Sequence, residues 1–239
     1  MGNNGKQTSV TIGSAHMQHT SMDLRSGMHI NCWPKELECE GWSAESLCQR
    51  IKETVEHTLY VAEMTVMLAR MAGIPESKIT YVRYGALLHD IGKLGIPAAI
   101  LLKPSSLSNA EWDIMRKHPI YAYDLLYPIE YLRPYLPIPF SHHEKWDGTG
   151  YPQGLKGEQI PLAARLFAVA DVWDSLYSDR VFREAWSQEK VMDYIQKQSG
   201  SHFDPGVIEM FLYVINKMDN QSVEAVGAAI STRRKRFGR

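Results

Sequence analysis

Apolar residues recur at helical spacing along most of this chain, and that period limits the fold more than any other feature. The longest run starts after Ser43, a candidate N-cap, and stops at Gly73-Ile74-Pro75. Its members stand mostly three or four residues apart: Leu47, Ile51, Val55, Leu59, Val61, Met64, Leu68 and Met71. Such spacing gathers apolar side chains on one face and predicts one long amphipathic helix.

Further helical stretches have start or stop signals of their own. A capping box at Ser108-Asn109-Ala110-Glu111 begins one, and Asp204-Pro205 has the form of an N-cap followed by proline. The four prolines between residues 127 and 140 allow only short, broken helices or turns there. These further helices are expected over residues 75–89, 108–119, 162–176, 187–198 and 204–218. No segment has the pattern of a strand, so we predict an all-α fold of roughly seven or eight helices.

The chain of 239 residues is long enough for one medium domain with extensions. Residues 1–42 are rich in Gly, Ser, Thr, Asn, Met and His and have no apolar period, which predicts a flexible N-terminal extension. Residues 43–220 are the expected folded domain. Residues 221–239 include a basic run at their end and are expected to form a solvated tail.

Charge and cysteine content argue against several classes of protein. The formal net charge is -1, so no basic field attracts a nucleic-acid polymer. Cys32, Cys39 and Cys48 form no CxxC pair, which favours free thiols in a reducing cytoplasm over structural zinc. No apolar run reaches the ~18 residues that a spanning helix needs, and the polar N-terminus does not have the form of a signal peptide. We therefore expect a cytoplasmic protein without membrane association.

A dense group of chemically active residues lies in the stretch His142-His143-Glu144-Lys145-Trp146-Asp147-Gly148-Thr149-Gly150-Tyr151-Pro152. On a helix, the side chains of two adjacent histidines would diverge by about 100°. His142 and His143 are therefore each expected to serve a different metal ion. The glycine-rich run after them favours a turn that fixes the ring of Tyr151 nearby. The stretch has the form of half of a metal-dependent active site.

Histidines and carboxylates elsewhere in the predicted helices can supply the other half. Imidazole with carboxylate and without thiolate suits iron, manganese or similar ions rather than structural zinc. Such a number of ligands is too large for one ion and suits two or three. The candidate ligands are Glu53, His57, His89, Asp90, His118, His142, His143 and Asp171.

Two of these carboxylates have positions that favour a metal role. Asp90 directly follows His89, so their side chains diverge, and Asp90 can bridge two ions while His89 serves one. Asp171 lies in an otherwise apolar helix, where a carboxylate is costly unless a cation compensates it. A salt bridge from Asp171 to an arginine is the alternative.

Three motifs carry a resemblance to a known family. His89-Asp90-Ile91-Gly92-Lys93, His118-Pro119 and the stretch from His142 to Pro152 resemble the signature of the HD-GYP family, a branch of the HD-domain metal-dependent phosphohydrolases. The similarity covers about residues 53–211. It implies an HD-domain helical bundle, a centre of two or three divalent ions, iron or manganese, and hydrolysis of the bacterial messenger cyclic di-GMP.

The resemblance also implies roles for single residues. It assigns metal binding to the eight candidate ligands, with Glu53 as the extra carboxylate that some members use for a third ion. Asp90 and Lys93 are the implied catalytic residues, and Lys93 would lie near the scissile phosphate. Substrate contacts are implied for Lys93, Tyr151, Arg180 and Arg183.

Some neighbouring residues have other expectations. Val181-Phe182 and Ser175-Leu176-Tyr177 depart from the family's common Pro-Tyr and Ala-Leu-Thr, which bears on substrate preference. Glu144, Trp146 and Asp147 are expected to fix their loop rather than to catalyse. His202 is expected to be structural.

The implied reaction is attack of a metal-activated hydroxide on phosphorus, with the ribose 3′-oxygen leaving. The product would be linear pGpG, which can be cut onward to GMP. Two alternatives stay open: a phosphodiesterase for another cyclic dinucleotide such as 3′,3′-cyclic GMP-AMP, and a non-catalytic module that binds cyclic di-GMP or a protein partner. The family resemblance further implies that the loop around Tyr151 can meet diguanylate cyclase domains. Oligomeric state is left open.

Overall fold

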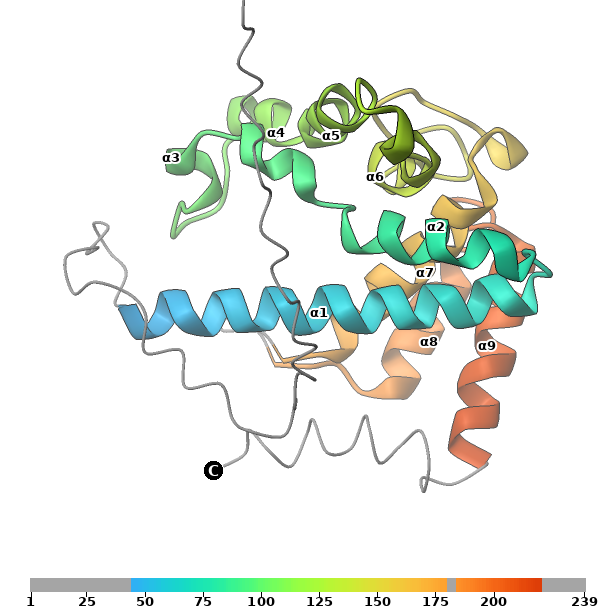
Figure 1. The fold of residues 1–239 in the computed structure, drawn as a ribbon. Coiled ribbons are helices and arrows are strands. Elements are labelled where there is room, and N and C mark those ends of the chain that lie inside the picture. Colours follow the sequence, from blue (N-terminus) through green and yellow to red (C-terminus); the bar gives the residue numbers. More distant parts are fainter. Residues whose placement is uncertain (1–43, 180–183, 221–239) are drawn as a thin grey trace, which may run out of the picture.

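The computed structural model describes residues 44–179 and 184–220, and for residues 44–53 and 218–220 it describes the backbone alone. The expected extension, 1–42, and the expected tail, 221–239, lie outside the described residues. Within the described part the chain forms helices and no strand (Figure 1), which confirms the all-α prediction. The α-helices are α1 Ala44–Met71, α2 Glu76–Leu87, α3 Ala98–Leu101, α4 Asn109–Met115, α5 His118–Leu126, α6 Pro137–Ser141, α7 Leu162–Tyr177, α8 Gln188–Lys197 and α9 Pro205–Asn220. The 3-10 helices are η1 Ile91–Gly95, η2 Glu130–Tyr135 and η3 Gly157–Gln159.

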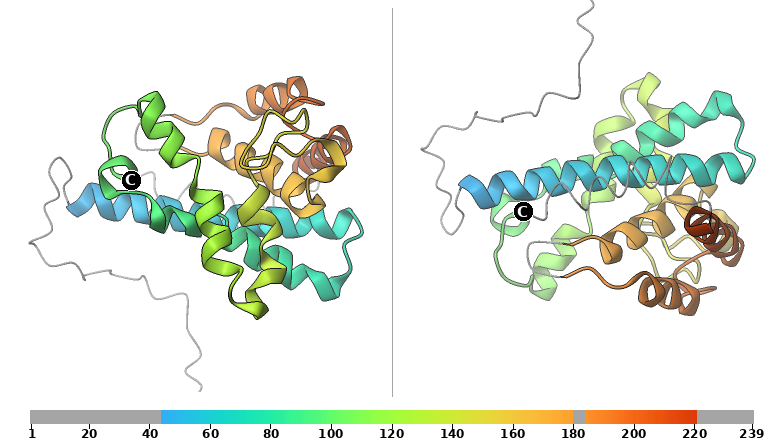
Figure 2. Two further views of the ribbon diagram at one scale, coloured as in Figure 1. Left: turned by 90° about the horizontal axis from the view of Figure 1, so that it is seen from above. Right: turned by 90° about the horizontal axis from the view of Figure 1, so that it is seen from below.

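The long helix α1 ends where the sequence predicted, in a turn built on a glycine. Gly73 has φ +75°, the left-handed region that glycine adopts most easily. Its N–H donates to the carbonyl of Arg70, and the N–H of Ile74 donates to that of Ala69, the two bonds of a Schellman motif. The chain then turns back, and α2 packs along α1 (Figures 1 and 2).

The core lies where α1, α7 and α9 meet. Helix α7 contacts α1, α6, α8 and α9, and its middle residues are almost fully buried. This burial explains why the sequence of α7 is apolar on nearly every side. The largest fully buried side chains of this core include Leu68, Leu166, Phe167, Ile195 and Phe211.

A short turn and the 3-10 helix η1 lead the chain from α2 to a contact with α5. After Leu87 the chain passes through His89 and Asp90 into η1, which packs against α5. The contact is close at Gly92, where an added Cβ would lie 1.8 Å from the carbonyl oxygen of His118. Glycine therefore lets the residues after α2 and the first residue of α5 approach one another.

The helix predicted over residues 108–119 ends earlier than expected, and a further helix that was not predicted, α5, begins at His118. The capping box is present, since Ser108 and Glu111 satisfy each other's backbone N–H groups, but α4 stops at Met115 and α5 starts at His118. Pro119 stands in the first turn of α5, where its missing N–H does no harm. The proline-rich segment forms only the short η2 and α6, as predicted. In the described ranges we find no helix with the length and apolarity needed to cross a bilayer.

Candidate metal centre

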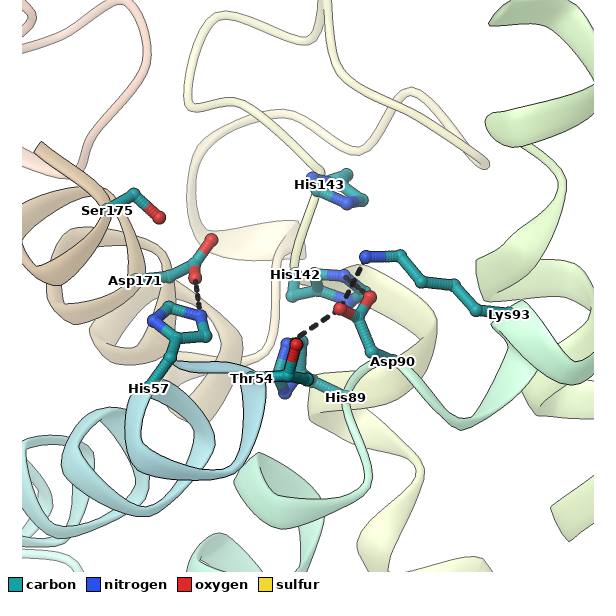
Figure 3. A pocket seen from close by; sticks show the side chains of 9 residues that line it. All are labelled: Thr54, His57, His89, Asp90, Lys93, His142, His143, Asp171 and Ser175. Atoms are coloured by element: carbon teal, nitrogen blue, oxygen red, sulfur yellow. Dashed lines mark hydrogen bonds and ion pairs between the residues drawn. The ribbon is translucent and has the colours of Figure 1, made fainter. Parts of the chain in front are cut away.

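A pocket of about 330 Å³ lies between α1, the α2–η1 junction, the end of α6 and α7 (Figure 3). This volume falls within the range of about 300–1,000 Å³ that is usual for small-molecule sites. The lining is polar and combines imidazoles, carboxylates, an ammonium group and hydroxyls. It consists of Thr54, His57, His89, Asp90, Lys93, His142, His143, Asp171 and Ser175.

The first group of candidate ligands, the His57 triad, comprises His57 on α1, His89 after α2, and Asp171 on α7. One nitrogen or oxygen atom of each residue lies within 4.8 Å of the others. Nε2 of His57 is 3.1 Å from Oδ1 of Asp171. Three elements that are distant in sequence thus bring their donor atoms together on one side of the pocket.

The second group, the His118 triad, comprises His118 at the start of α5 together with His142 and His143. Their donor atoms also lie within 4.8 Å of one another, and Nε2 of His118 is 3.2 Å from Nε2 of His142. The expectation that His142 and His143 diverge toward different ions is wrong in its geometry, because both belong to this triad and their ring centroids are 4.0 Å apart. His142 is the C-cap residue of α6, so His143 lies outside the helix for which the angle of about 100° was expected.

Asp90 lies between the two triads. Its Oδ2 is 3.2 Å from Nε2 of His89, whereas its Oδ1 is 3.5 Å from Nε2 of His118 and 4.0 Å from that of His142. Each carboxylate oxygen therefore faces a different triad, which is the placement that a bridging ligand requires. The ammonium of Lys93 donates to Oδ2 of Asp90 at 2.5 Å and points into the same pocket (Figure 3).

Backbone carbonyls fix the direction of several imidazole rings. Nδ1 of His89 donates to the carbonyl of Ala86 at 2.8 Å, and Nδ1 of His118 to that of Met115 at 2.9 Å. Nδ1 of His142 has the carbonyls of residues 138 and 139 within 3.2 Å. With the proton on Nδ1, each Nε2 presents a lone pair to the pocket.

The described residues fit a metal cation. The lone pairs of His118 and His142 point at each other across 3.2 Å, an arrangement that is unfavourable for two acceptors unless a cation lies nearby. At the other triad, Nε2 of His57 lies 3.1 Å from the carboxylate of Asp171, a pairing that a proton on Nε2 or a metal cation between the two groups can satisfy. The donors are imidazole nitrogens and carboxylate oxygens, a set that suits iron or manganese.

The pKa values of the three histidines in the His118 triad are lowered, whereas the pKa of His57 is raised. Burial lowers the pKa of His142 to about 3 and that of His118 below its usual value. Burial and the neighbouring histidines hold the pKa of His143 well below its usual range. These three imidazoles are neutral at neutral pH, as ligation requires. Burial also opposes charge on His57, but hydrogen bonds with Asp171 and Asp174 raise its pKa to about 9.

The loop after His143 is held by a buried carboxylate. Glu144 is only 2 % exposed and accepts hydrogen bonds from the N–H groups of Gln153 at 2.7 Å and Leu155 at 3.0 Å. The ring of Tyr151 stacks on His143, with centroids 4.8 Å apart, and its N–H donates to the carbonyl of His143. Asp147 accepts from Thr149 in the same loop. Glu144 and Asp147 thus fix the loop, as the sequence predicted.

We expect Glu144→Gln to lower the free energy of unfolding by about 3 kcal/mol, because hydrogen bonds to a buried charge contribute about 1.5–3 kcal/mol each. The amide NH2 would face a backbone N–H that now has a carboxylate oxygen. Urea denaturation measures the effect, and Glu158→Gln on the exposed surface of η3 is the matched control. Equal stability of the two variants would contradict the assigned role of Glu144.

Most of the predicted ligands converge on the pocket, and two groups of residues lie outside the description. The ligands that line it are His57, His89, Asp90, His142, His143 and Asp171, and His118 joins them through its place in the His118 triad. Glu53 falls within α1, but its side chain is not among those described, and Arg180 and Arg183 lie outside the described residues. Thr54 and Ser175 in the pocket wall and Asp174 behind His57 were not predicted as site residues. For Asp174 the sequence did contain a signal, because residues three apart on a helix, such as Asp171 and Asp174, lie on the same face.

The sequence of residues 42–207 matches the family model of the HD domain. The chain therefore belongs to the HD-domain family, and its HD and GYP motifs place it in the HD-GYP branch. It is similar to a protein of Vibrio cholerae named cyclic di-GMP phosphodiesterase, with 42% identity over 70% of this chain and 37% of the relative. It is also similar to a 3′3′-cGAMP-specific phosphodiesterase of the same organism, with 37% identity over 71% of this chain and 33% of the relative. The chain thus spans about a third of the length of these relatives.

Solved structures show the same fold. A Bdellovibrio bacteriovorus protein described as HDG"Y"P superposes with a TM-score of 0.55 at 22% identity, covering 73% of this chain and 58% of that one. A cyclic GMP-AMP phosphodiesterase of Vibrio cholerae superposes with a TM-score of 0.53 at 20% identity, covering 67% of this chain and 44% of that one. At such identities the likeness extends to the helical architecture alone.

Proposed function

We propose that this chain hydrolyses cyclic di-GMP to linear pGpG with divalent ions held at the two triads. The observation that carries the proposal is the position of Asp90, whose two oxygens face different triads. Phosphodiester cleavage by two ions about 3.5–4 Å apart is a recurrent mechanism. Four relatives named cyclic di-GMP phosphodiesterases, with identities of 34%, 39%, 40% and 42%, support this substrate.

The triad residues and Asp90 would hold two ions, and Glu53 is proposed for a third. Bound ions would supply a nucleophilic hydroxide and would offset negative charge on the phosphate. The nitrogen and oxygen donors favour iron or manganese over softer metals. Asp90, with one carboxylate oxygen facing each triad, would fix the two metal positions relative to each other.

Substrate contacts would come from groups around the pocket mouth. Lys93 would donate to a phosphate oxygen or to the leaving oxygen, because its ammonium lies beside Asp90. Tyr151, held on His143, would contact a guanine; burial raises its pKa to about 12, so its hydroxyl keeps its proton. Arg180 and Arg183 are proposed to bind the second phosphate as bidentate donors.

We expect Lys93→Ala to lower kcat for cyclic di-GMP by about 100-fold, the usual effect of removing one donor that stabilises developing charge. Bound metal should stay the same, because the lysine nitrogen is a cation and not a ligand. Steady-state kinetics with parallel metal analysis measure both quantities, and Lys78→Ala on the exposed face of α2 is the control. Unchanged kcat would remove Lys93 from the proposed mechanism.

A second candidate substrate is 3′,3′-cyclic GMP-AMP. Relatives named for that activity are 37% and 34% identical to this chain, and Ser175 adds a hydroxyl to the pocket wall. The two substrates differ in one base, so relative turnover of the two is the quantity that distinguishes the candidates.

The test is a turnover comparison with protein reconstituted anaerobically with iron or with manganese. Cyclic di-GMP, 3′,3′-cyclic GMP-AMP and linear pGpG are supplied separately, and the products are separated by chromatography. Faster release of pGpG from cyclic di-GMP than of products from the mixed dinucleotide supports the proposal. The reverse order favours the second candidate. Nucleotide binding without hydrolysis would replace both with a non-catalytic binding module.

The proposal includes a cytoplasmic location, where nucleotide messengers are synthesised and degraded. It also includes contact with a diguanylate cyclase domain through the loop around Tyr151. Thr149 and Gln153 of this loop are exposed, so a partner can reach it. Affinity measurement against a purified diguanylate cyclase domain, with Thr149→Arg as the disrupted variant, tests the contact.

A further inference from the structure

Asp174 is a buried carboxylate that does not line the pocket. Its residue is 2 % exposed and lies on α7 between Trp173 and Ser175. Oδ2 lies 2.6 Å from Nδ1 of His57, and Oδ1 accepts a hydrogen bond from the hydroxyl of Ser178 at 2.9 Å. A buried carboxylate is costly unless it is paired, so this placement requires a compensating role.

Its hydrogen bond with Asp174 distinguishes His57 from three other histidines of the metal centre. His89, His118 and His142 direct Nδ1 to backbone carbonyls, whereas His57 directs Nδ1 to a carboxylate. A carboxylate behind a ligating histidine fixes the ring and its tautomer and makes the opposite nitrogen a stronger donor. The opposite nitrogen is Nε2, which faces Asp171 and the pocket.

We propose that Asp174 is a positioning residue that holds His57 with Nε2 toward the pocket and strengthens divalent-metal binding at the His57 triad. The inference rests on the proposed metal centre and adds a residue that touches neither metal nor substrate. Its effect is expected to be local, because the Asp174 carboxylate forms hydrogen bonds with His57 and with Ser178. Replacing the carboxylate with an amide should therefore weaken one metal position and leave the other unchanged.

The test is a titration of the chelator-stripped protein of 239 residues with manganese(II), followed by the electron paramagnetic resonance signal of free manganese. His57→Ala identifies the class of sites that belongs to the His57 triad. We expect Asp174→Asn to raise the Kd of that class by about 10–100-fold, the usual range for losing such a partner. The Kd at the His118 triad should stay within about threefold, which also shows that the variant is folded.

Ser178→Ala is the matched control, because it removes the hydrogen bond to the other oxygen of Asp174 and leaves the contact with His57. It should change neither Kd by more than about threefold. In the His57→Ala background, Asp174→Asn should have no further effect on manganese binding, since the two residues act through one contact.

Three results would overturn the inference: an unchanged Kd in Asp174→Asn, equal weakening at both triads, or additive effects of the two substitutions. In each of these cases the wild-type protein still binds manganese and the proposed function stands. Wild-type protein that binds no manganese would remove the proposed metal centre together with the role of Asp174. Turnover of a nucleotide is not needed for any of these measurements.

Discussion

Asp90→Ala is expected to reduce cyclic di-GMP turnover by about a thousandfold or more. Asp90 faces both triads, so its loss would weaken two metal positions with one substitution. Metal ions contribute several kcal/mol to the stabilisation of such transition states, and about 1.4 kcal/mol corresponds to a factor of ten in rate. Lys93 would also lose the carboxylate that now holds its ammonium in the pocket.

Metal analysis separates this prediction from a general loss of structure. Bound manganese should fall together with turnover in Asp90→Ala, while the helical circular dichroism signal stays. The matched control is Asp193→Ala on α8, which removes an exposed carboxylate that pairs with Lys197. The control should retain wild-type turnover, because surface ion pairs contribute about 0–1 kcal/mol. Full activity of Asp90→Ala would contradict the bridging role.

The helices that the sequence predicted best have local signals at their ends. The glycine turn after α1, the capping box before α4 and the N-terminus of α9 all involve residues within a few positions of one another. The break between α4 and α5 was not predicted, because Trp112 and Met115 continue the apolar period up to His118. Proline in the first turn of a helix and proline after a helix give the same local pattern.

The types of the site residues were readable from the sequence, but their directions were not. Histidine and aspartate at separate motifs suggested a common metal site, and the pocket brings them together. The convergence of His142 and His143 depends on where α6 ends, which short-range pattern does not determine. Likewise, two carboxylates on α7 share one face, and only packing against α1 decides that Asp171 faces the pocket while Asp174 lies behind His57.

Gly92→Ala is the second substitution with a large expected effect, and its target is the approach of η1 to α5. The added Cβ would lie 1.8 Å from the carbonyl oxygen of His118 and 2.6 Å from the backbone nitrogen of Ala122. Backbone atoms cannot rotate away as a side chain can, so the two elements must separate. We expect the free energy of unfolding to fall by about 3 kcal/mol or more, the upper part of the range for overpacking.

The same displacement should reach the metal centre, because His118 is the first residue of α5 and Asp90 precedes η1 directly. Manganese binding at the His118 triad should weaken more than binding at the His57 triad, whose members lie on α1, after α2 and on α7. Gly206→Ala near the start of α9 is the matched control, since its Cβ would meet only Asp204 at 3.5 Å. Urea denaturation of that variant should give wild-type stability or a gain of up to about 1 kcal/mol, because alanine favours a helix over glycine. If Gly92→Ala were as stable as Gly206→Ala and bound manganese normally, the close contact between η1 and α5 would not be what sets the position of His118.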